Sequence, residues 1–115
     1  MSGQKDAARR YFKAYEDKDR AAIEPLLADS FTFSSPQDDR ISRNAYFRDC
    51  WPNSAAINGF ALERLIENGS EVVVRYLLEM LDGRKMRNVE LFRFEAGQIV
   101  EVDVYFGRSV EETRP

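Results

Sequence analysis

Residues 71–106 read EVVVRYLLEMLDGRKMRNVELFRFEAGQIVEVDVYF, and this stretch predicts three antiparallel strands. Apolar and polar side chains alternate over Glu71–Leu81, Arg84–Phe94 and Ile99–Phe106, which is typical of strands. Asp82-Gly83 separates the first two runs, and Asp-Gly between alternating runs is a strong hairpin signal. We therefore expect a sheet here that organises the rest of the chain.

The hairpin turn also predicts a register. With Asp82-Gly83 as a two-residue turn, counting back along both strands sets Arg75 opposite Glu90. This face would then carry a charged pair among large apolar residues such as Leu77 and Phe92. The pair is either an exposed cross-strand ion pair of little energetic value or a charged pair in the wall of a pocket. Its apolar neighbours favour the pocket.

The other face of the same strands is also apolar. It would carry Val72, Val74, Tyr76 and Leu78. A soluble protein of this size cannot leave two apolar sheet faces in water. We therefore expect helices to cover one face and a second subunit to cover the other, so that the protein is a homodimer formed through the outer face of its sheet.

Length, composition and charge exclude several classes of protein. The 115 residues predict a single domain over residues 1–115, and an apolar content of 43% excludes a disordered chain. The net charge of −3, without a basic block, argues against nucleic acid as a partner. No apolar run approaches ~20 residues, and the first residues lack an apolar signal sequence. We expect no membrane span and a cytoplasmic location.

The chain contains no histidine and one cysteine, Cys50. This excludes Ser-His-Asp and Cys-His catalysis, an internal disulfide and zinc sites that depend on imidazole or on several thiolates. Proton transfer would have to come from Asp, Glu, Tyr, Lys or Cys. The sequence has no glycine-rich phosphate loop and no metal-ligand spacing, so we expect no bound cofactor and no metal.

Three helices are predicted before the sheet. Apolar residues recur every three or four positions over residues 4–17, and Asp19 and Ser42 are suitable N-caps for helices over 20–27 and 43–51. A short strand is expected at 31–33, a polar loop at 37–41 and a longer, bent strand at 57–67. This order predicts an α+β fold, in which a curved antiparallel sheet wraps around three helices and leaves a cone with a pocket at its mouth.

Several short motifs occur in an order typical of one superfamily. They are Arg10-Tyr11, Asp19 with Ile23, Leu27-Ala28-Asp29, Phe31-Thr32-Phe33, Phe92-Arg93-Phe94, Gly97-Gln98-Ile99-Val100 and Tyr105-Phe106. With these motifs the chain resembles, from about Ala7 to Gly107, the nuclear-transport-factor-2-like (NTF2-like) superfamily, which includes SnoaL-like polyketide cyclases, ketosteroid isomerases and limonene-epoxide hydrolases. The resemblance implies a cone-shaped, cystatin-like α+β barrel with a deep apolar pocket, and dimers through the outer sheet face.

The spacing matches the ketosteroid isomerases best. This implies that Tyr11 donates a hydrogen bond to a substrate oxyanion and that Glu90 is an uncharged acid with the same purpose, while Trp51 replaces a supporting pocket tyrosine. The general base of those enzymes would sit at Ser35, and a serine cannot act as that base. The catalytic aspartate of the epoxide hydrolases corresponds to Val104.

We expect a pocket protein that binds a small apolar carbonyl compound and isomerises or cyclises it. The predicted catalytic residues are Tyr11, Glu90 and Glu79, with one of the glutamates exchanging a proton. Arg75 would hold a ligand carboxylate or tune Glu90 by favouring its ionised form. The other predicted ligand-binding residues are Tyr15, Phe33, Ser35, Tyr46, Trp51, Asn88, Phe92 and Val104. Two alternatives stay open: a non-catalytic ligand-binding module that has lost the usual base, and a protein-interaction module whose functional surface is the apolar sheet face.

Overall fold

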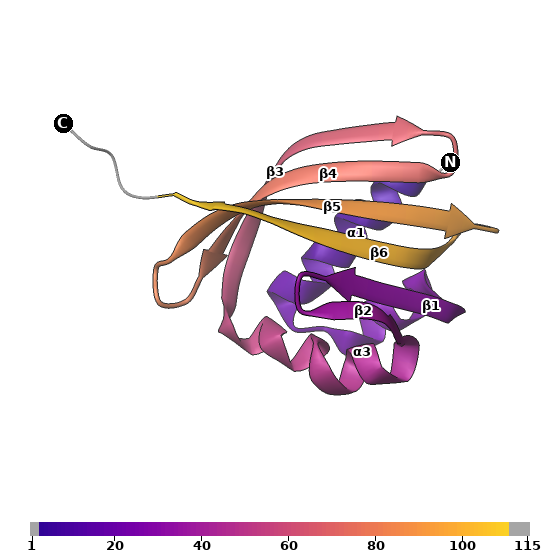
Figure 1. The fold of residues 1–115 in the computed structure, drawn as a ribbon, viewed down its shortest axis with the longest axis horizontal. Helices are drawn as coiled ribbons and strands as arrows, with labels where there is room; N and C mark the ends of the chain where they lie inside the picture. Colours follow the sequence, from indigo (N-terminus) through magenta and orange to yellow (C-terminus); the bar gives the residue numbers. More distant parts are fainter. Residues whose placement is uncertain (1–2, 111–115) are drawn as a thin grey trace.

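The computed structural model describes residues 3–110, in which helices pack against one side of a curved sheet (Figure 1). The helices are α1 (Gln4–Asp17), α2 (Arg20–Ile23) and α3 (Arg43–Asp49), with short 3₁₀ helices at Glu24–Leu26 and Trp51–Ala56. The Asp19 and Ser42 side chains accept hydrogen bonds from backbone amides of α2 and α3, so both predicted N-caps are confirmed. No helix within residues 3–110 is long and apolar enough to cross a bilayer.

Within residues 3–110, six strands form one sheet in the order β2-β1-β6-β5-β4-β3. Their bounds are β1 (Leu27–Ser35), β2 (Asp38–Ser42), β3 (Ile57–Asn68), β4 (Glu71–Met80), β5 (Lys85–Glu95) and β6 (Gln98–Ser109). The predicted α+β class and curved sheet are confirmed. Several details differ from the prediction. Strand β1 runs parallel to β6 and is longer than the expected 31–33, α2 ends at Ile23, and most of the loop expected at 37–41 belongs to the edge strand β2. The sheet is therefore mixed and open.

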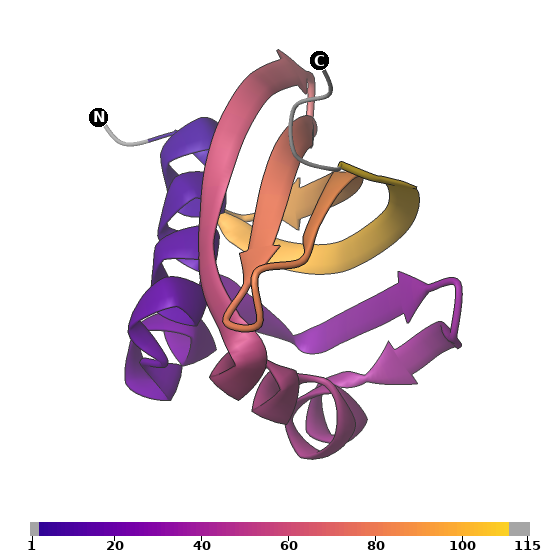
Figure 2. The same cartoon turned by 90° about the vertical axis from the view of Figure 1, so that its left-hand side faces the viewer.

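The core lies between α1 and the face of the sheet that α1 covers, called the inner face below. Figure 2 shows the curvature of the sheet, with α1 along β3 and α3 near β1 and β2. The rings of Tyr11 and Phe12 lie with centroids 5.0 and 5.8 Å from the ring of Phe92 on β5. This aromatic packing fixes α1 against the strands that carry the site.

The β4–β5 hairpin closes with three residues, Leu81, Asp82 and Gly83, and not with two. The Met80 amide donates to the Arg84 carbonyl at 2.8 Å, and the Gly83 amide donates to the Met80 carbonyl at 3.0 Å. Gly83 has a φ of 92°, a conformation that glycine adopts without steric cost. Three-residue loops with glycine in such a position are the next most common hairpin type after two-residue turns.

The extra loop residue moves the pairing of β4 and β5 by one position. Glu90 lies opposite Val74, and Arg75 lies opposite Val89. The prediction that set Arg75 opposite Glu90 is therefore wrong, because a slip of one residue exchanges the faces of one strand relative to the other. Glu90 shares the inner face with Val74 and Tyr76, whereas Arg75 lies on the outer face.

Candidate functional site

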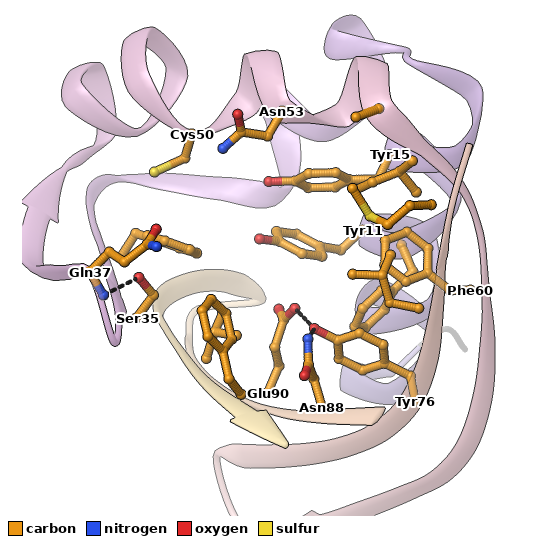
Figure 3. A pocket seen from close by; sticks show the side chains of 18 of the residues that line it. Tyr11, Tyr15, Ser35, Gln37, Cys50, Asn53, Phe60, Tyr76, Asn88 and Glu90 are labelled. Carbon is orange, nitrogen blue, oxygen red and sulfur yellow. Dashed lines mark hydrogen bonds between the residues drawn. The ribbon is translucent and has the colours of Figure 1, made fainter. Parts of the chain in front are cut away.

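A cavity of about 340 Å³ lies between α1, the inner face of the sheet and the β1–β2 hairpin (Figure 3). Its wall is mostly apolar, with Phe12, Phe60, Ile57 and Leu78 between a few polar groups. No cluster of three or more Cys, Asp or Glu side chains within residues 3–110 could hold a metal ion. A concave apolar site with a few convergent polar groups is typical of small-molecule binding.

Glu90 is the acid at the centre of this cavity. It is 6% exposed, and its Oε1 accepts a 2.7 Å hydrogen bond from the Tyr76 hydroxyl. Its Oε2 is buried and has no hydrogen-bond partner among the described residues. Burial raises the pKa of Glu90 from 4.5 to about 7, and the hydrogen bond from Tyr76 offsets only part of this rise. At neutral pH a large fraction of Glu90 is therefore uncharged, and a proton on Oε2 would have no acceptor among the described residues.

Tyr76 is positioned by an irregularity in the β5–β6 pairing. The Asn88 Nδ2 group donates to the Tyr76 hydroxyl at 3.4 Å, and Asn88 Oδ1 accepts a 3.0 Å hydrogen bond from the Gly107 amide. The ladder slips just after Arg87, and a Cβ at Gly107 would lie 1.8 Å from the Arg87 carbonyl oxygen. Only glycine permits this approach. A chain of hydrogen bonds thus leads from the Gly107 amide through Asn88 and Tyr76 to Glu90.

Three tyrosine hydroxyls form a second polar group, and those of Tyr11 and Tyr15 point into the cavity (Figure 3). The Tyr46 hydroxyl is hydrogen-bonded to that of Tyr11 at 3.1 Å and also to that of Tyr15. Burial raises the pKa of all three phenols, so each keeps its proton. The three hydroxyl groups therefore carry three protons but form two hydrogen bonds with one another. When Tyr46 donates its proton to Tyr11 or to Tyr15, the hydroxyl proton of that residue is free to form a hydrogen bond with a ligand.

The opposite wall carries different chemistry, because the β1–β2 hairpin and the residues after α3 form it (Figure 3). Asp38 Oδ2 accepts hydrogen bonds from the Ser35 hydroxyl at 3.3 Å and from the Cys50 thiol at 3.7 Å. Burial, together with the neighbouring Asp38, raises the pKa of Cys50 to about 12, so the thiol stays protonated at neutral pH. The cavity thus has neutral donors on one wall and a carboxyl group on the other.

Most of the predicted site residues surround this cavity. Seven line it: Tyr11, Tyr15, Phe33, Ser35, Asn88, Glu90 and Val104. Three others stand behind the lining residues. Tyr46 is hydrogen-bonded to both cavity tyrosines, the Trp51 ring lies 4.7 Å from that of Tyr15, and the Phe92 ring lies 5.0 Å from that of Tyr11.

Arg75 and Glu79 lie outside the cavity, which corrects their predicted positions. Both alternate along β4 with residues that line the cavity, so their side chains belong to the outer face. There Arg75 Nε lies 3.1 Å from Glu63 Oε1, and Arg87 Nη2 lies 2.7 Å from Glu63 Oε2. The cation expected beside Glu90 is therefore paired elsewhere, and it does not favour the ionised form of that acid.

Tyr76 and Asp38 were not among the predicted site residues. A two-residue turn would place Tyr76 on the face away from Glu90, whereas the three-residue loop brings both to the same face. Asp38 lies in the stretch that was expected to be a loop, yet it pairs with Ser35 across the turn that joins β1 and β2. The signal for this hairpin was present in Pro36-Gln37, which separates the alternating run that ends at Ser35 from a second short run.

These features define a class of protein, an α+β fold whose open curved sheet and helices enclose a small, largely apolar cavity. The chain belongs to the SnoaL-like domain family, which matches residues 8–102, and so to the NTF2-like superfamily. A search of curated proteins found no match to this sequence.

Several solved structures share the fold. An NTF2-like protein of unknown function from Cytophaga hutchinsonii is 24% identical, with a TM-score of 0.75 over 92% of this chain and 94% of that chain. A candidate ketosteroid isomerase from Kribbella flavida is 20% identical, with a TM-score of 0.75 over 96% and 82%. A candidate polyketide cyclase from Sinorhizobium meliloti is 19% identical, with a TM-score of 0.72 over 86% and 93%. At these identities the likeness establishes the fold.

Proposed function

We propose that this protein moves a proton on a small, mostly apolar carbonyl compound bound in the cavity. The observation that carries the proposal is Glu90, a buried acid with a raised pKa whose Oε2 has no partner among the described residues. An uncharged acid and a tyrosine hydroxyl can both donate hydrogen bonds to one carbonyl oxygen. Donors fixed in advance in an apolar site stabilise the negative charge that develops on such an oxygen. Glu90 and Tyr11 supply these two donors.

Asp38 supplies the proton acceptor that Ser35 cannot provide. In this scheme the C–H bond next to the carbonyl breaks and its proton goes to the Asp38 carboxylate. The bonding electrons move onto the carbonyl oxygen, where Glu90 and Tyr11 hold them as an enolate. Return of the proton from Asp38 to a different carbon of a conjugated enolate completes an isomerisation. In a cyclisation the enolate carbon attacks a second carbonyl carbon, the π electrons of that C=O bond move onto its oxygen, and the proton from Asp38 goes there to give a hydroxyl group. The likeness to a candidate isomerase and a candidate cyclase supports this class of reaction.

Exchange of carbon-bound hydrogen for deuterium tests this step without knowledge of the product. A panel of apolar cyclic ketones in D₂O is incubated with the protein, and loss of the proton signal next to the carbonyl is followed by NMR. We expect Asp38→Asn to slow the protein-dependent exchange about 10²-fold or more. Glu90→Gln and Tyr11→Phe should each slow it roughly 10- to 10³-fold. Glu79→Gln, on the outer face, is the matched control and should leave the rate unchanged.

The same experiment separates an enzyme from a non-catalytic binder. A binder would shift the resonances of a bound ketone, and Glu90→Gln would weaken that binding, but no exchange would exceed the rate in buffer. Exchange that is equally fast in Asp38→Asn and in the unaltered protein would remove Asp38 from the scheme. A protein that neither binds nor exchanges any ketone in the panel would contradict the proposed function.

We further propose that the outer face of the sheet pairs with a second copy of the chain. This face carries Val73, Leu77, Val89 and Leu91, which are only partly buried in one chain. Tyr105, on the same face, is 55% exposed. A surface with this many partly covered apolar side chains is typical of an interface.

A further inference from the structure

A second hollow of about 670 Å³ adjoins the cavity at the end nearest the β4–β5 hairpin; we call it the distal groove. The two hollows share five lining residues: Gln37, Leu78, Met80, Asn88 and Phe106. Because they share these five residues, the two hollows lie next to each other.

The wall of the distal groove is mostly apolar away from the hairpin. Met80, Met86 and Val110 line it, and the partly exposed ring of Phe106 stands where it meets the cavity. Unbranched thioether side chains adapt to ligands of varied shape, and a 47% exposed phenylalanine offers more apolar area to cover. The surface therefore suits a flexible hydrocarbon segment.

Charge distinguishes the hairpin end of the groove from the cavity. Arg84 and Lys85 line it there, and no Asp or Glu is among its described lining residues. Arg84 does contact Asp82 at 2.8 Å, but both side chains are largely exposed, so this pair competes weakly with a ligand. In contrast, the cavity holds Glu90 and would desolvate an anion without offering it a cation.

We propose that the ligand is an elongated apolar acid whose oxygen-bearing end lies at Tyr11 and Glu90, whose hydrocarbon body crosses Met80 and Phe106, and whose acidic group lies at Arg84 and Lys85. The placement of the oxygen-bearing end rests on the proposed function. The placement of the acid rests on the groove alone. The bound molecule thus has a neutral head inside and a charged tail at the hairpin.

Straight-chain carboxylic acids of about 6 to 16 carbons, below their micelle concentrations, test the groove by isothermal titration. We expect affinity to rise with length, by at most about fourfold for each added methylene that is buried. Each acid should bind about fivefold more tightly than its methyl ester, because the ester lacks the charge. Affinity that does not change with chain length would overturn the proposal.

Two sets of variants locate the ends of the ligand. The double change Arg84→Glu with Lys85→Glu should abolish the preference for acid over ester, whereas Arg9→Glu with Lys13→Glu, on the exposed side of α1, should leave it unchanged. Met86→Trp, checked for folding by circular dichroism, should weaken the binding of the long acids and leave the binding of the short acids unchanged. A preference for acid that survives reversal of both charges at the hairpin would overturn the proposal.

Other occupants of the groove would give different results. Binding that appears only in a chain ending at Val110 would assign the groove to residues 111–115 and overturn the proposal. A dimer that the acid dissociates, detected by sedimentation, would assign it to a second copy with the same consequence. Glu90→Gln should slow exchange on ketones without altering the preference for acid over ester, so failure of the proposed reaction and failure of this inference remain distinguishable.

Discussion

The Tyr76 hydroxyl donates a 2.7 Å hydrogen bond to Glu90 Oε1, and this is the hydrogen bond that the buried carboxyl receives from the described residues. One neutral donor does not replace the water that an ionised carboxylate would lose on burial. The folded protein therefore favours the protonated form of Glu90. Its stability and its ligand binding should both depend on pH for this reason.

Glu90 should make the free energy of unfolding fall as the pH rises. Below about pH 4.5 the residue is protonated in both the folded and the unfolded chain. Between pH 4.5 and about 7 the unfolded chain loses this proton while the folded chain keeps it, so the free energy of unfolding falls as the pH rises. We expect a loss of about 3 kcal/mol across this range, because each pH unit corresponds to about 1.4 kcal/mol. Urea unfolding at a series of pH values measures it.

Glu90→Gln is the control for this pH dependence. Other carboxyls, such as Glu63, have lowered pKa values, so their contribution to the free energy of unfolding increases as the pH rises. The quantity to compare is therefore the difference in free energy of unfolding between the protein and the variant. A difference that is constant from pH 4.5 to 8 would show that Glu90 does not titrate abnormally in the folded state.

Gly107→Ala should destabilise the protein, because its Cβ would lie 1.8 Å from the Arg87 carbonyl oxygen. The strands must separate locally to accept it, and forced overpacking of this kind costs about 1–3 kcal/mol. The movement also disturbs the hydrogen bond from the Gly107 amide to Asn88. Gly3→Ala is the control, because nothing lies within 4 Å of its added methyl group and only the smaller loss of a favourable N-cap residue of α1 is expected. Equal unfolding midpoints for the two variants would contradict the close approach.

The sequence determined the fold class and most of the cavity, since apolar periodicity places Tyr11 and Tyr15 on the buried side of α1. It did not determine the partner of Glu90. A two-residue Asp-Gly turn needs a positive φ at both residues, whereas only Gly83 has one here, and a change of one loop residue exchanges the faces of a strand. Asp38 could be placed only through the turn at Pro36-Gln37, which folds it back onto Ser35.

Cys50 should react slowly with iodoacetamide. Its pKa of about 12 leaves roughly 10³-fold less thiolate at pH 8 than an ordinary cysteine has. Asp38→Asn should speed the reaction, because Asp38 adds to the rise in pKa through its charge and its hydrogen bond. Mass spectrometry of the alkylated protein measures the rate. Equal rates for the folded protein and for the protein in urea would contradict this account of the far wall.

Leu91→Glu should separate the proposed dimer, because it places a charge at the centre of the outer face. Sedimentation velocity should show a dimer for the unaltered protein and a monomer for the variant. Ala21→Glu adds the same charge at an exposed position on α2 and should leave the dimer intact. A protein that is monomeric throughout the micromolar range would refute the proposed interface.

The central claim is that Glu90 is protonated in the cavity at neutral pH, and NMR can follow this protonation through the side-chain carboxyl carbon. Glutamate labelled with ¹³C at this carbon is titrated from pH 3 to 9, and Glu90→Gln identifies the resonance. We expect a midpoint near 7 and a still higher one in Tyr76→Phe, because the lost hydrogen bond stabilises the ionised form. A midpoint near 4.5 that Tyr76→Phe does not move would contradict a neutral acid in the cavity.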